Sequence, residues 1–196
     1  MATAEAAPPI FVAQHPALDF INSAYGMDDA RRDALVDDAS VLAWLRMAGL
    51  LTDPVPAPPR GLLRRARALR EAAGRLVRTP DSPSAEDLAL VDAIRERGRP
   101  VETLGWAPGA PRPVLRQRRR DDGIDALLEP VATALARLLA EGDIGRVREC
   151  EAHDCTLLFE DLTRSGRRRW CSMALCGNRM KVAAFRSRRR GSDADH

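Results

Sequence analysis

The stretch "CEAHDCTLLFEDLTRSGRRRWCSMALCGNRMK", residues 150–181, holds all four cysteines of the 196-residue chain. Their spacing is Cys150-x4-Cys155-x15-Cys171-x4-Cys176. Two close pairs on either side of a longer segment are typical of a structural zinc site, in which each pair supplies two corners of a tetrahedron. Four thiolates leave no open coordination position, so the pattern predicts one structural Zn²⁺ per chain. Two disulfides or four free buried thiols are the alternatives.

Three other residues of this stretch allow more than one interpretation. His153 could replace a cysteine as a ligand, but four thiolates already fill the tetrahedron, which favours an exposed loop histidine. Trp170 could stack on a nucleic-acid base, yet its place beside Cys171 favours the core of the finger. Asn178 could read adenine, cap the start of a helix or donate to a cysteine sulfur, and we favour the cap.

The segments between and after the cysteines predict a hairpin followed by a helix. "TLLFED" suits a short apolar strand, "LTRSGR" a turn, and "RRRWC" a returning strand, while "GNRMKVAAFRSRRR" suits a helix. A knuckle, a hairpin and a helix in this order resemble a treble-clef finger. We expect the inward side of the helix to carry Met180, Ala183 and Ala184, and its outward side to carry Arg179, Lys181, Arg186 and Arg188.

Charge is distributed unevenly along the chain. Residues 144–190 contain 12 Lys/Arg and 5 Asp/Glu, a net charge of +7, whereas the remainder contains 19 and 23, a net charge of −4. A neutral-to-acidic body with a basic C-terminal region points to a polyanionic partner for that region.

The chain contains no apolar run near the roughly 18 residues that a membrane span needs. Its first residues, "MATAEAAPPIFVAQ", lack the basic and apolar regions of a signal peptide. We therefore expect a cytoplasmic protein without a membrane partner, in a compartment where clustered cysteines bind metal more often than they form disulfides.

The N-terminal part reads as a set of amphipathic helices. Asp38 or Ser40 is expected to cap the second helix and Ser84 the fourth, and Pro130 to kink the last. A β-hairpin is expected to join "VETLGWA" to "PVLRQRR", with Arg118 to Arg120 in a solvated loop. The expected helices lie within residues 15–26, 37–51, 61–78, 82–97 and 123–142, and their inward residues include Leu18, Val41, Leu45, Leu62, Ala66, Leu69, Ala73, Leu76, Leu88, Val91, Ile94, Leu127, Val131, Leu135 and Leu138.

The fold class predicted is mainly α: a helical N-terminal domain with a small β-hairpin, followed by a treble-clef-like zinc finger. We place a disordered N-terminus at residues 1–9, the helical domain at 10–143, the finger at 144–190 and a disordered tail at 191–196.

Three polar residues stand out in the first, otherwise apolar helix. His15, Asp19 and Asn22 lie about one turn apart, and buried polar groups must be hydrogen-bonded. They are candidates for an effector pocket. The alternative is that they fix the neighbouring loop or cap a helix.

Two motifs carry a resemblance to known families. "RRWCSMALCGNR" closely resembles the CGNR zinc finger, named for the residues found here as Cys176 to Arg179. "HPALDFINS" resembles the LDFxNT motif that opens the companion ABATE domain, with Ser23 in place of threonine. The resemblance implies a bacterial, stress-induced transcription regulator. It also implies that Cys150, Cys155, Cys171 and Cys176 bind the zinc.

These features together predict a DNA-binding regulator whose N-terminal domain senses an effector or forms a homodimer. Arginine suits this role because its planar guanidinium pairs with phosphate or with guanine. An RNA- or protein-binding zinc module is the alternative. An enzyme acting through His15, Asp19 and Asn22 is disfavoured, because no nucleophile with a base and an orienting group is visible. The residues expected to contact DNA are Arg179, Lys181, Arg186, Arg188, Arg189 and Arg190.

Overall fold

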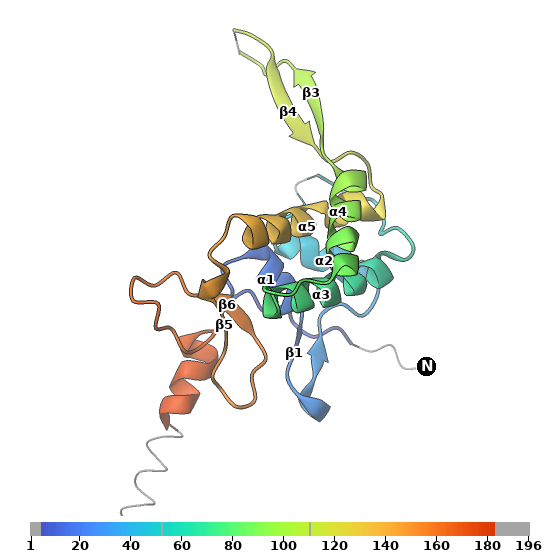
Figure 1. Ribbon diagram of the computed structural model, residues 1–196. Coiled ribbons are helices and arrows are strands. Elements are labelled where there is room, and N and C mark those ends of the chain that lie inside the picture. Colours follow the sequence, from blue (N-terminus) through green and yellow to red (C-terminus); the bar gives the residue numbers. More distant parts are fainter. Residues whose placement is uncertain (1–4, 52, 110, 183–196) are drawn as a thin grey trace, which may run out of the picture.

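The computed structural model describes residues 5–51, 53–109 and 111–182, which form a helical bundle followed by a small cysteine-rich finger (Figure 1). The fold is mainly α, as the sequence predicts. The bundle contains α1 (Pro16–Ile21), α2 (Asp38–Met47), α3 (Leu62–Arg78), α4 (Ala85–Gly98) and α5 (Ile124–Ala140). The short elements are β1 (Ala24–Tyr25), η1 (Asp28–Ala30), β2 (Arg32–Asp33), β3 (Val101–Gly105), β4 (Val114–Arg118), η2 (Ile144–Arg146), β5 (Val147–Glu149), β6 (Leu158–Glu160) and η3 (Met173–Gly177).

The short helix α1 lies at the centre of the bundle, in contact with α3 and α5. Leu18 and Phe20 are fully buried there, and the Phe20 ring meets Trp44 of α2 edge to face at a centroid distance of 5.2 Å. An apolar helix of six residues is too short to be stable alone. It is helical because the longer helices bury it.

The buried stripe of α3 follows the predicted spacing from Leu62 to Leu76, whereas α4 departs from it. Val91 and Ile94 are buried, but Leu88 is 40% exposed. Asp87 takes the inward position instead, because its carboxylate accepts two hydrogen bonds from Arg75 at 2.6 and 2.8 Å. The prediction that Leu88 faces inward is therefore wrong.

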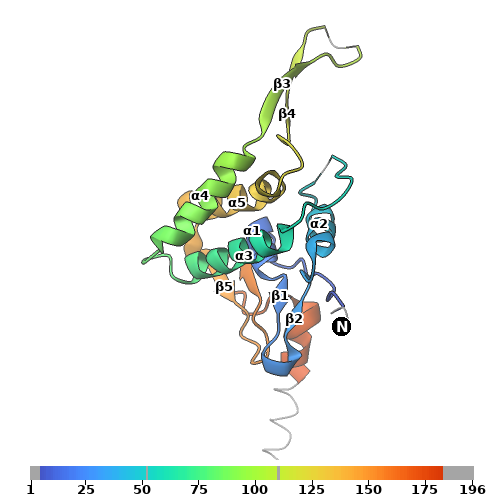
Figure 2. The ribbon, with the colours of Figure 1, turned by 90° about the vertical axis from the view of Figure 1, so that its right-hand side faces the viewer.

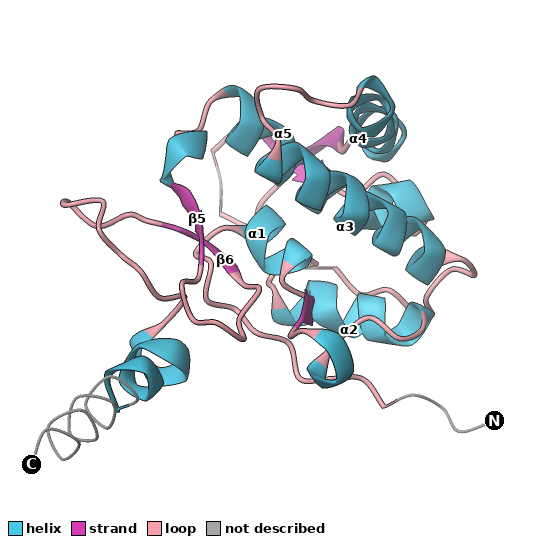
Figure 3. Cartoon of the chain, turned by 60° about the horizontal axis from the view of Figure 1, so that its bottom comes forward, coloured by secondary structure: helices cyan, strands magenta, loops and turns pink. Residues whose placement is uncertain are grey.

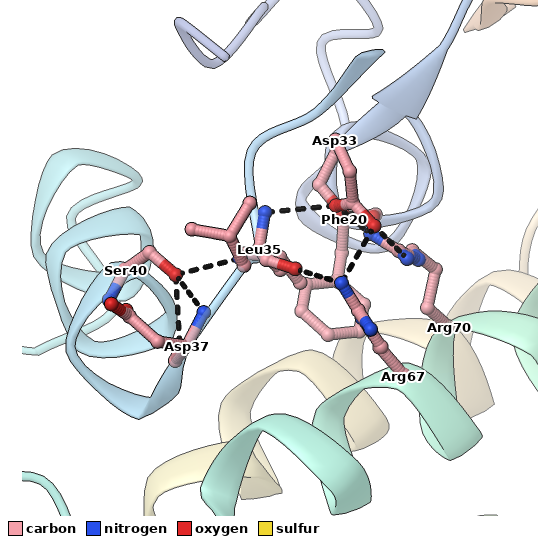
Figure 4. A network of polar contacts seen from close by, with 9 residues as sticks. Phe20, Asp33, Leu35, Asp37, Ser40, Arg67 and Arg70 are labelled. Carbon is pink, nitrogen blue, oxygen red and sulfur yellow. Dashed lines mark hydrogen bonds and ion pairs between the residues drawn. The ribbon is translucent and has the colours of Figure 1, made fainter. Parts of the chain in front are cut away.

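Arg70 is the one buried arginine of α3. Its side chain is buried and donates to Ser23 Oγ at 2.9 Å and to both oxygens of Asp33 at 2.7 and 2.8 Å. Figure 4 shows this network, in which Arg67 also donates to the Leu35 carbonyl. Burial alone would raise the pKa of Asp33, but hydrogen bonds from Arg70 and the Leu35 N–H outweigh it and lower the pKa. The network joins α3 to the β1–β2 hairpin.

The cap of α2 is Asp37, and not Asp38 or Ser40 as expected. Asp37 accepts from the Ser40 N–H at 2.7 Å, and Ser40 Oγ accepts from the Asp37 N–H, which completes a capping box. Asp38 instead accepts from the N–H groups of Gly61 and Leu63 at the start of α3. It therefore caps the following helix across the bundle. Ser84 caps α4 as predicted.

The predicted hairpin is present as β3 and β4, with Val101 opposite Arg118 and Gly105 opposite Val114. Arg118 therefore belongs to a strand and not to a loop. The hairpin follows Gly98, the last residue of α4, where α4 and α5 touch: a Cβ at this glycine would lie 2.3 Å from the Asp125 carbonyl oxygen. The ribbon then leaves the bundle and projects beyond it (Figure 2).

Residues 5–9, which were expected to be disordered, lie along the β1–β2 hairpin. The Ala7 N–H donates to Asp33 O at 3.0 Å, and the Tyr25 hydroxyl donates to Pro8 O at 3.2 Å. The expected disorder of 1–4 and 191–196 concerns residues outside the described part of the chain. Within that part, none of the helices has the length and apolarity needed to cross a membrane.

Candidate metal centre

The four cysteine sulfurs converge on one point of the finger, and all lie within 4.8 Å of one another. Cys155 Sγ is 3.9 Å from Cys171 Sγ, which in turn is 3.6 Å from Cys176 Sγ. A tetrahedral zinc with Zn–S bonds of about 2.3 Å places its sulfurs about 3.8 Å apart. The spacing of the sulfurs is therefore close to that of a site for one Zn²⁺.

The chemistry of the four thiols also fits a metal. A hydrogen bond from the Cys171 thiol, with others from the cluster, lowers the pKa of Cys155 to about 5. Burial raises the pKa of Cys176 to about 11, and the neighbouring Cys155 raises that of Cys171. The protein by itself thus favours the thiolate form of Cys155 and the thiol forms of Cys171 and Cys176. A bound Zn²⁺ would supply the positive charge that lets all four ionise.

Two donors inside the finger stabilise the sulfurs. The Cys171 N–H donates to Cys150 Sγ at 3.3 Å, and Arg179 Nη2 donates to Cys176 Sγ at 3.7 Å. Arg179 is itself held by Asp154, to which Nη2 donates at 2.6 Å and Nη1 also donates. Because Zn²⁺ with four thiolates has a formal charge of −2, a guanidinium fixed beside Cys176 is well placed to offset it.

The fourth cysteine is presented by η3. The Ser172 hydroxyl caps this turn by accepting from the Leu175 N–H at 2.9 Å, and residues 178–182 continue it as an α-helix. Asn178 lies inside this continuous helical segment. It is therefore not the N-terminal cap that was expected, because Ser172 occupies that position six residues earlier.

The strands of the finger pair differently from the prediction. Leu158–Glu160 is a strand as expected, but its partner is Val147–Glu149, which precedes the cysteines. The segment 167–170 forms no strand with it, because the other edge of β6 is already occupied. There the Leu158 N–H donates to Asn22 Oδ1 at 2.9 Å and the Glu160 N–H donates to Ala13 O at 3.1 Å.

Arg168 and Trp170 pack against the hydrophobic core of the finger, which is separate from the core of the bundle. The Arg168 guanidinium lies 4.3 Å from the centroid of the Phe159 ring and donates to the Trp170 carbonyl at 3.0 Å. Trp170 packs against the cluster of Cys150, Cys171 and Phe159, which agrees with its predicted role in the finger core. His153 is exposed and lies outside the sulfur cluster, as expected.

The finger is attached to the bundle through the residues on both sides of α1. Asn22 makes two hydrogen bonds with the backbone of Leu158, and Arg168 donates to Val12 O at 3.3 Å. Leu158 is 2% exposed and belongs to the core of the bundle, whereas Val12 packs against the core of the finger. The two parts therefore interlock, with β5 and β6 between α1 and the finger's helix (Figure 3).

The three polar residues proposed for an effector pocket all contact backbone. His15 Nδ1 accepts from the Ala17 N–H at 3.3 Å and caps α1. Asp19 accepts from the N–H groups of Val12 and Ala13 at 3.0 and 2.9 Å, and Asn22 holds β6. These contacts match the alternative interpretation, in which the three residues fix a neighbouring loop or cap a helix. Effector binding by these residues stays a prediction.

A cleft of about 770 Å³ lies beside α3, and its lining includes none of these three residues. Its wall includes Arg31 and Glu71 of the bundle and Thr156 of the finger. No sequence pattern indicates this cleft, because its walls come from three separate parts of the chain, residues 21–31, residues 70–87 and Thr156.

The residues predicted to contact DNA divide into two groups. Lys181 and Arg179 are exposed on the helix that follows the last cysteine, although Arg179 is paired with Asp154. The remaining four residues, and the expected inward Ala183 and Ala184, lie outside the described part of the chain. They are Arg186, Arg188, Arg189 and Arg190.

A helical bundle interlocked with a four-cysteine site that fits one Zn²⁺ defines this chain as a zinc-finger protein. The chain belongs to the ABATE family, whose model is described as "Putative stress-induced transcription regulator" and matches residues 14–142. The CGNR zinc finger matches residues 146–189. Neither description names an enzymatic activity. No curated protein matches the chain.

Proposed function

We propose that this protein is a zinc-dependent transcription regulator that binds duplex DNA through its basic C-terminal finger. The observation that carries the proposal is the distribution of charge: residues 144–190 have a net charge of +7, whereas the rest of the chain has a net charge of −4. Nucleic-acid affinity rests largely on neutralising phosphates. The family description supports the regulatory role, and we assign the protein no catalytic activity. A reduced four-thiolate site suits the cytoplasm.

Within the finger, Lys181 and the arginines that follow are the expected DNA contacts. Lys181 is exposed, and no described carboxylate pairs with it. Arg179 is a weaker candidate, because its guanidinium already bridges Asp154 and Cys176. Arg179 would therefore contact a DNA base only if DNA displaces Asp154. We assign phosphate contacts to Lys181 and to the run Arg188–Arg190.

The test is DNA binding by the zinc-loaded protein across a range of salt concentrations. The triple variant Arg188→Gln, Arg189→Gln, Arg190→Gln should bind all duplexes more weakly. Its salt slope should fall by up to about one unit for each lost phosphate contact. A matched control carries the same charge change on the bundle, at three exposed arginines: Arg60→Gln, Arg64→Gln and Arg137→Gln. Equal affinity of wild type and finger variant would reject the proposal.

An RNA- or protein-binding finger is the alternative function. It is favoured if a single-stranded RNA of the same length competes more strongly than duplex DNA. Capture of genomic fragments with the purified protein separates the possibilities further, because a duplex-DNA regulator should enrich one sequence motif.

We further propose that the bundle forms a homodimer or senses an effector. A single small finger contacts few base pairs, and two fingers on one duplex would raise affinity through their effective concentration. Light scattering at micromolar concentration should then give twice the chain mass in the presence of a two-half-site duplex. A monomer mass with and without DNA would remove the dimer from the proposal.

A further inference from the structure

The β3–β4 hairpin is an unpartnered arm at the end of the molecule opposite the finger (Figures 1 and 2). It pairs over five residues on each strand, from Val101 opposite Arg118 to Gly105 opposite Val114. At about 3.4 Å per residue the paired part is about 17 Å long, and the turn extends it further. Because the bundle contacts the ribbon only at its base, the described residues of the ribbon add nothing to the hydrophobic core, and another role is expected for them.

The arm carries three large apolar side chains that nothing in the described part of the chain covers. Leu104, Trp106 and Leu115 are 71%, 64% and 68% exposed, the highest values among the large hydrophobic side chains of the described residues. Leu104 and Leu115 are direct cross-strand partners. Trp106 comes directly after the last residue of β3, two positions along the chain from Leu104. Exposed apolar patches of this kind mark interaction surfaces.

The arm is also basic. Residues 100–120 contain five arginines and one glutamate, a net charge of +4. Arg116 and Arg118 lie on β4, and Arg112 lies nearer the tip. No carboxylate of the described residues forms an ion pair with these three arginines, whereas Arg119 at the base is paired with Asp122. The glutamate, Glu102, accepts from Gln117 across the ribbon.

Charge decides between the possible occupants of this surface. Two copies of the arm would bring two charges of +4 together, so pairing of hairpins is opposed by repulsion. A polyanion is attracted instead. A two-stranded ribbon also fits the major groove of B-DNA, which is about 12 Å wide, and ribbons that bind DNA use apolar side chains against bases and sugars.

We propose that the β3–β4 hairpin is a second nucleic-acid contact, separate from the finger, which enters a groove of duplex DNA. Arg112, Arg116 and Arg118 bind phosphates, and Trp106 with Leu104 lies against the groove. Contacts at both ends of the molecule would fix its orientation along the duplex.

The experiment measures binding of a labelled mixed-sequence duplex of about 40 base pairs to the full-length, zinc-loaded chain. The arm variant is Arg112→Gln, Arg116→Gln, Arg118→Gln. It should bind about 10- to 100-fold more weakly near 50 mM salt, with a salt slope smaller by about two to three units. The control is the bundle variant Arg60→Gln, Arg64→Gln, Arg137→Gln, which should bind as wild type does.

A second readout follows the arm itself. Trp106 is the most exposed of the three tryptophans, since Trp44 is buried and Trp170 half-buried. Saturating duplex should shift or quench its emission, and the change should be missing in Trp106→Phe. The change should persist in the finger variant Arg188→Gln, Arg189→Gln, Arg190→Gln, because the arm is a separate site.

The outcomes separate this inference from the proposed function. Weaker binding by the finger variant but not by the arm variant would overturn the arm and leave the finger's role standing. Weaker binding by the arm variant alone would support the arm and reject the finger. Competition by poly-glutamate as strong as that by duplex DNA at equal charge would show a surface for acidic protein, and would overturn the inference, as would the absence of DNA binding by wild type.

Discussion

Asn22 on the bundle holds the backbone of Leu158 on the finger by two hydrogen bonds. Asn22 Nδ2 donates to Leu158 O at 2.8 Å, and the Leu158 N–H donates to Asn22 Oδ1 at 2.9 Å. The residues are separated by 136 positions, and both are almost fully buried. One side chain therefore satisfies two backbone groups of β6 that water cannot reach.

Replacing Asn22 should loosen the finger from the bundle. Asn22→Ala leaves the buried N–H and C=O of Leu158 without partners, and each such group costs about 1–3 kcal/mol. We expect the free energy of unfolding to fall by about 2–4 kcal/mol and hydrogen exchange at the Leu158 amide to accelerate. Gln117→Ala removes an exposed amide and should change neither quantity. If hydrogen exchange at the Leu158 amide is as slow in Asn22→Ala as in wild type, the contact does not stabilise the attachment of the finger.

The parts of the fold that sequence predicted are those fixed by local pattern. The stripe from Leu62 to Leu76 and the hairpin around residues 101–118 depend on spacing and turn residues within one segment. The clustered cysteines likewise follow from their spacing. Each of these structures is decided by side chains that are neighbours along the chain.

The parts that sequence missed depend on partners far along the chain. The edge of β6 is filled by Asn22 and Ala13, so the segment 167–170 could not pair there, although its composition suits a strand. Arg70 is buried because Asp33, on another element, supplies a carboxylate. Nothing within the Arg-rich segment 61–78 distinguishes Arg70 from its exposed neighbours.

Breaking the ion pair between Arg70 and Asp33 should cost much more than breaking an exposed one. Arg70→Ala leaves the partly buried Asp33 carboxylate with only the Leu35 N–H and the 3.4 Å contact from Arg67, and it removes the donor to the Ser23 hydroxyl. We expect a loss of about 3 kcal/mol, since Asp33 keeps some solvent contact. Arg95→Ala breaks the exposed pair with Asp92 and should cost less than about 0.5 kcal/mol. Chemical denaturation of both variants measures the difference. Similar losses in the two would contradict the role of burial.

The same ion pair should make stability depend on pH in acid. The pKa of Asp33 is lower in the folded than in the unfolded chain, where it is about 3.9. The stabilisation is therefore complete above about pH 4 and is lost as pH falls through the lowered folded-state pKa. The difference in unfolding free energy between wild type and Asp33→Asn should thus be larger at pH 6 than at pH 3. A difference that does not change with pH would mean that the charge of Asp33 contributes nothing.

Arg179 should matter for retaining zinc as well as for any contact with DNA. Its guanidinium bridges Asp154 and Cys176 Sγ, and partners of metal ligands typically change metal affinity 10- to 100-fold. We expect Arg179→Ala to release zinc to a coloured chelator about tenfold faster or more. Lys181→Ala, two residues along the same helix, should release it at the wild-type rate. Equal rates of zinc release from the two variants would show that Arg179 does not stabilise the zinc site, and would leave DNA contact as its expected role.

Removing zinc should unfold the finger and also weaken the bundle, because Leu158 belongs to the core of the bundle. Chelation, or Cys155→Ser, removes the metal that organises residues 150–182, a contribution on the order of 10 kcal/mol in small zinc sites. The helices of the bundle have their own core and should keep their circular dichroism.

The bundle should nevertheless melt at a lower temperature, since release of β6 exposes the site of Leu158, worth about 1.5–3 kcal/mol, and leaves Asn22 unpaired. Chelator added to Cys155→Ser should have no further effect. In the Asn22→Ala background, where the attachment is already weakened, zinc removal should lower the melting temperature less than in wild type, because the two changes break one interface. Additive effects, or a bundle whose melting temperature is unchanged after complete zinc loss, would show that the two domains are energetically independent.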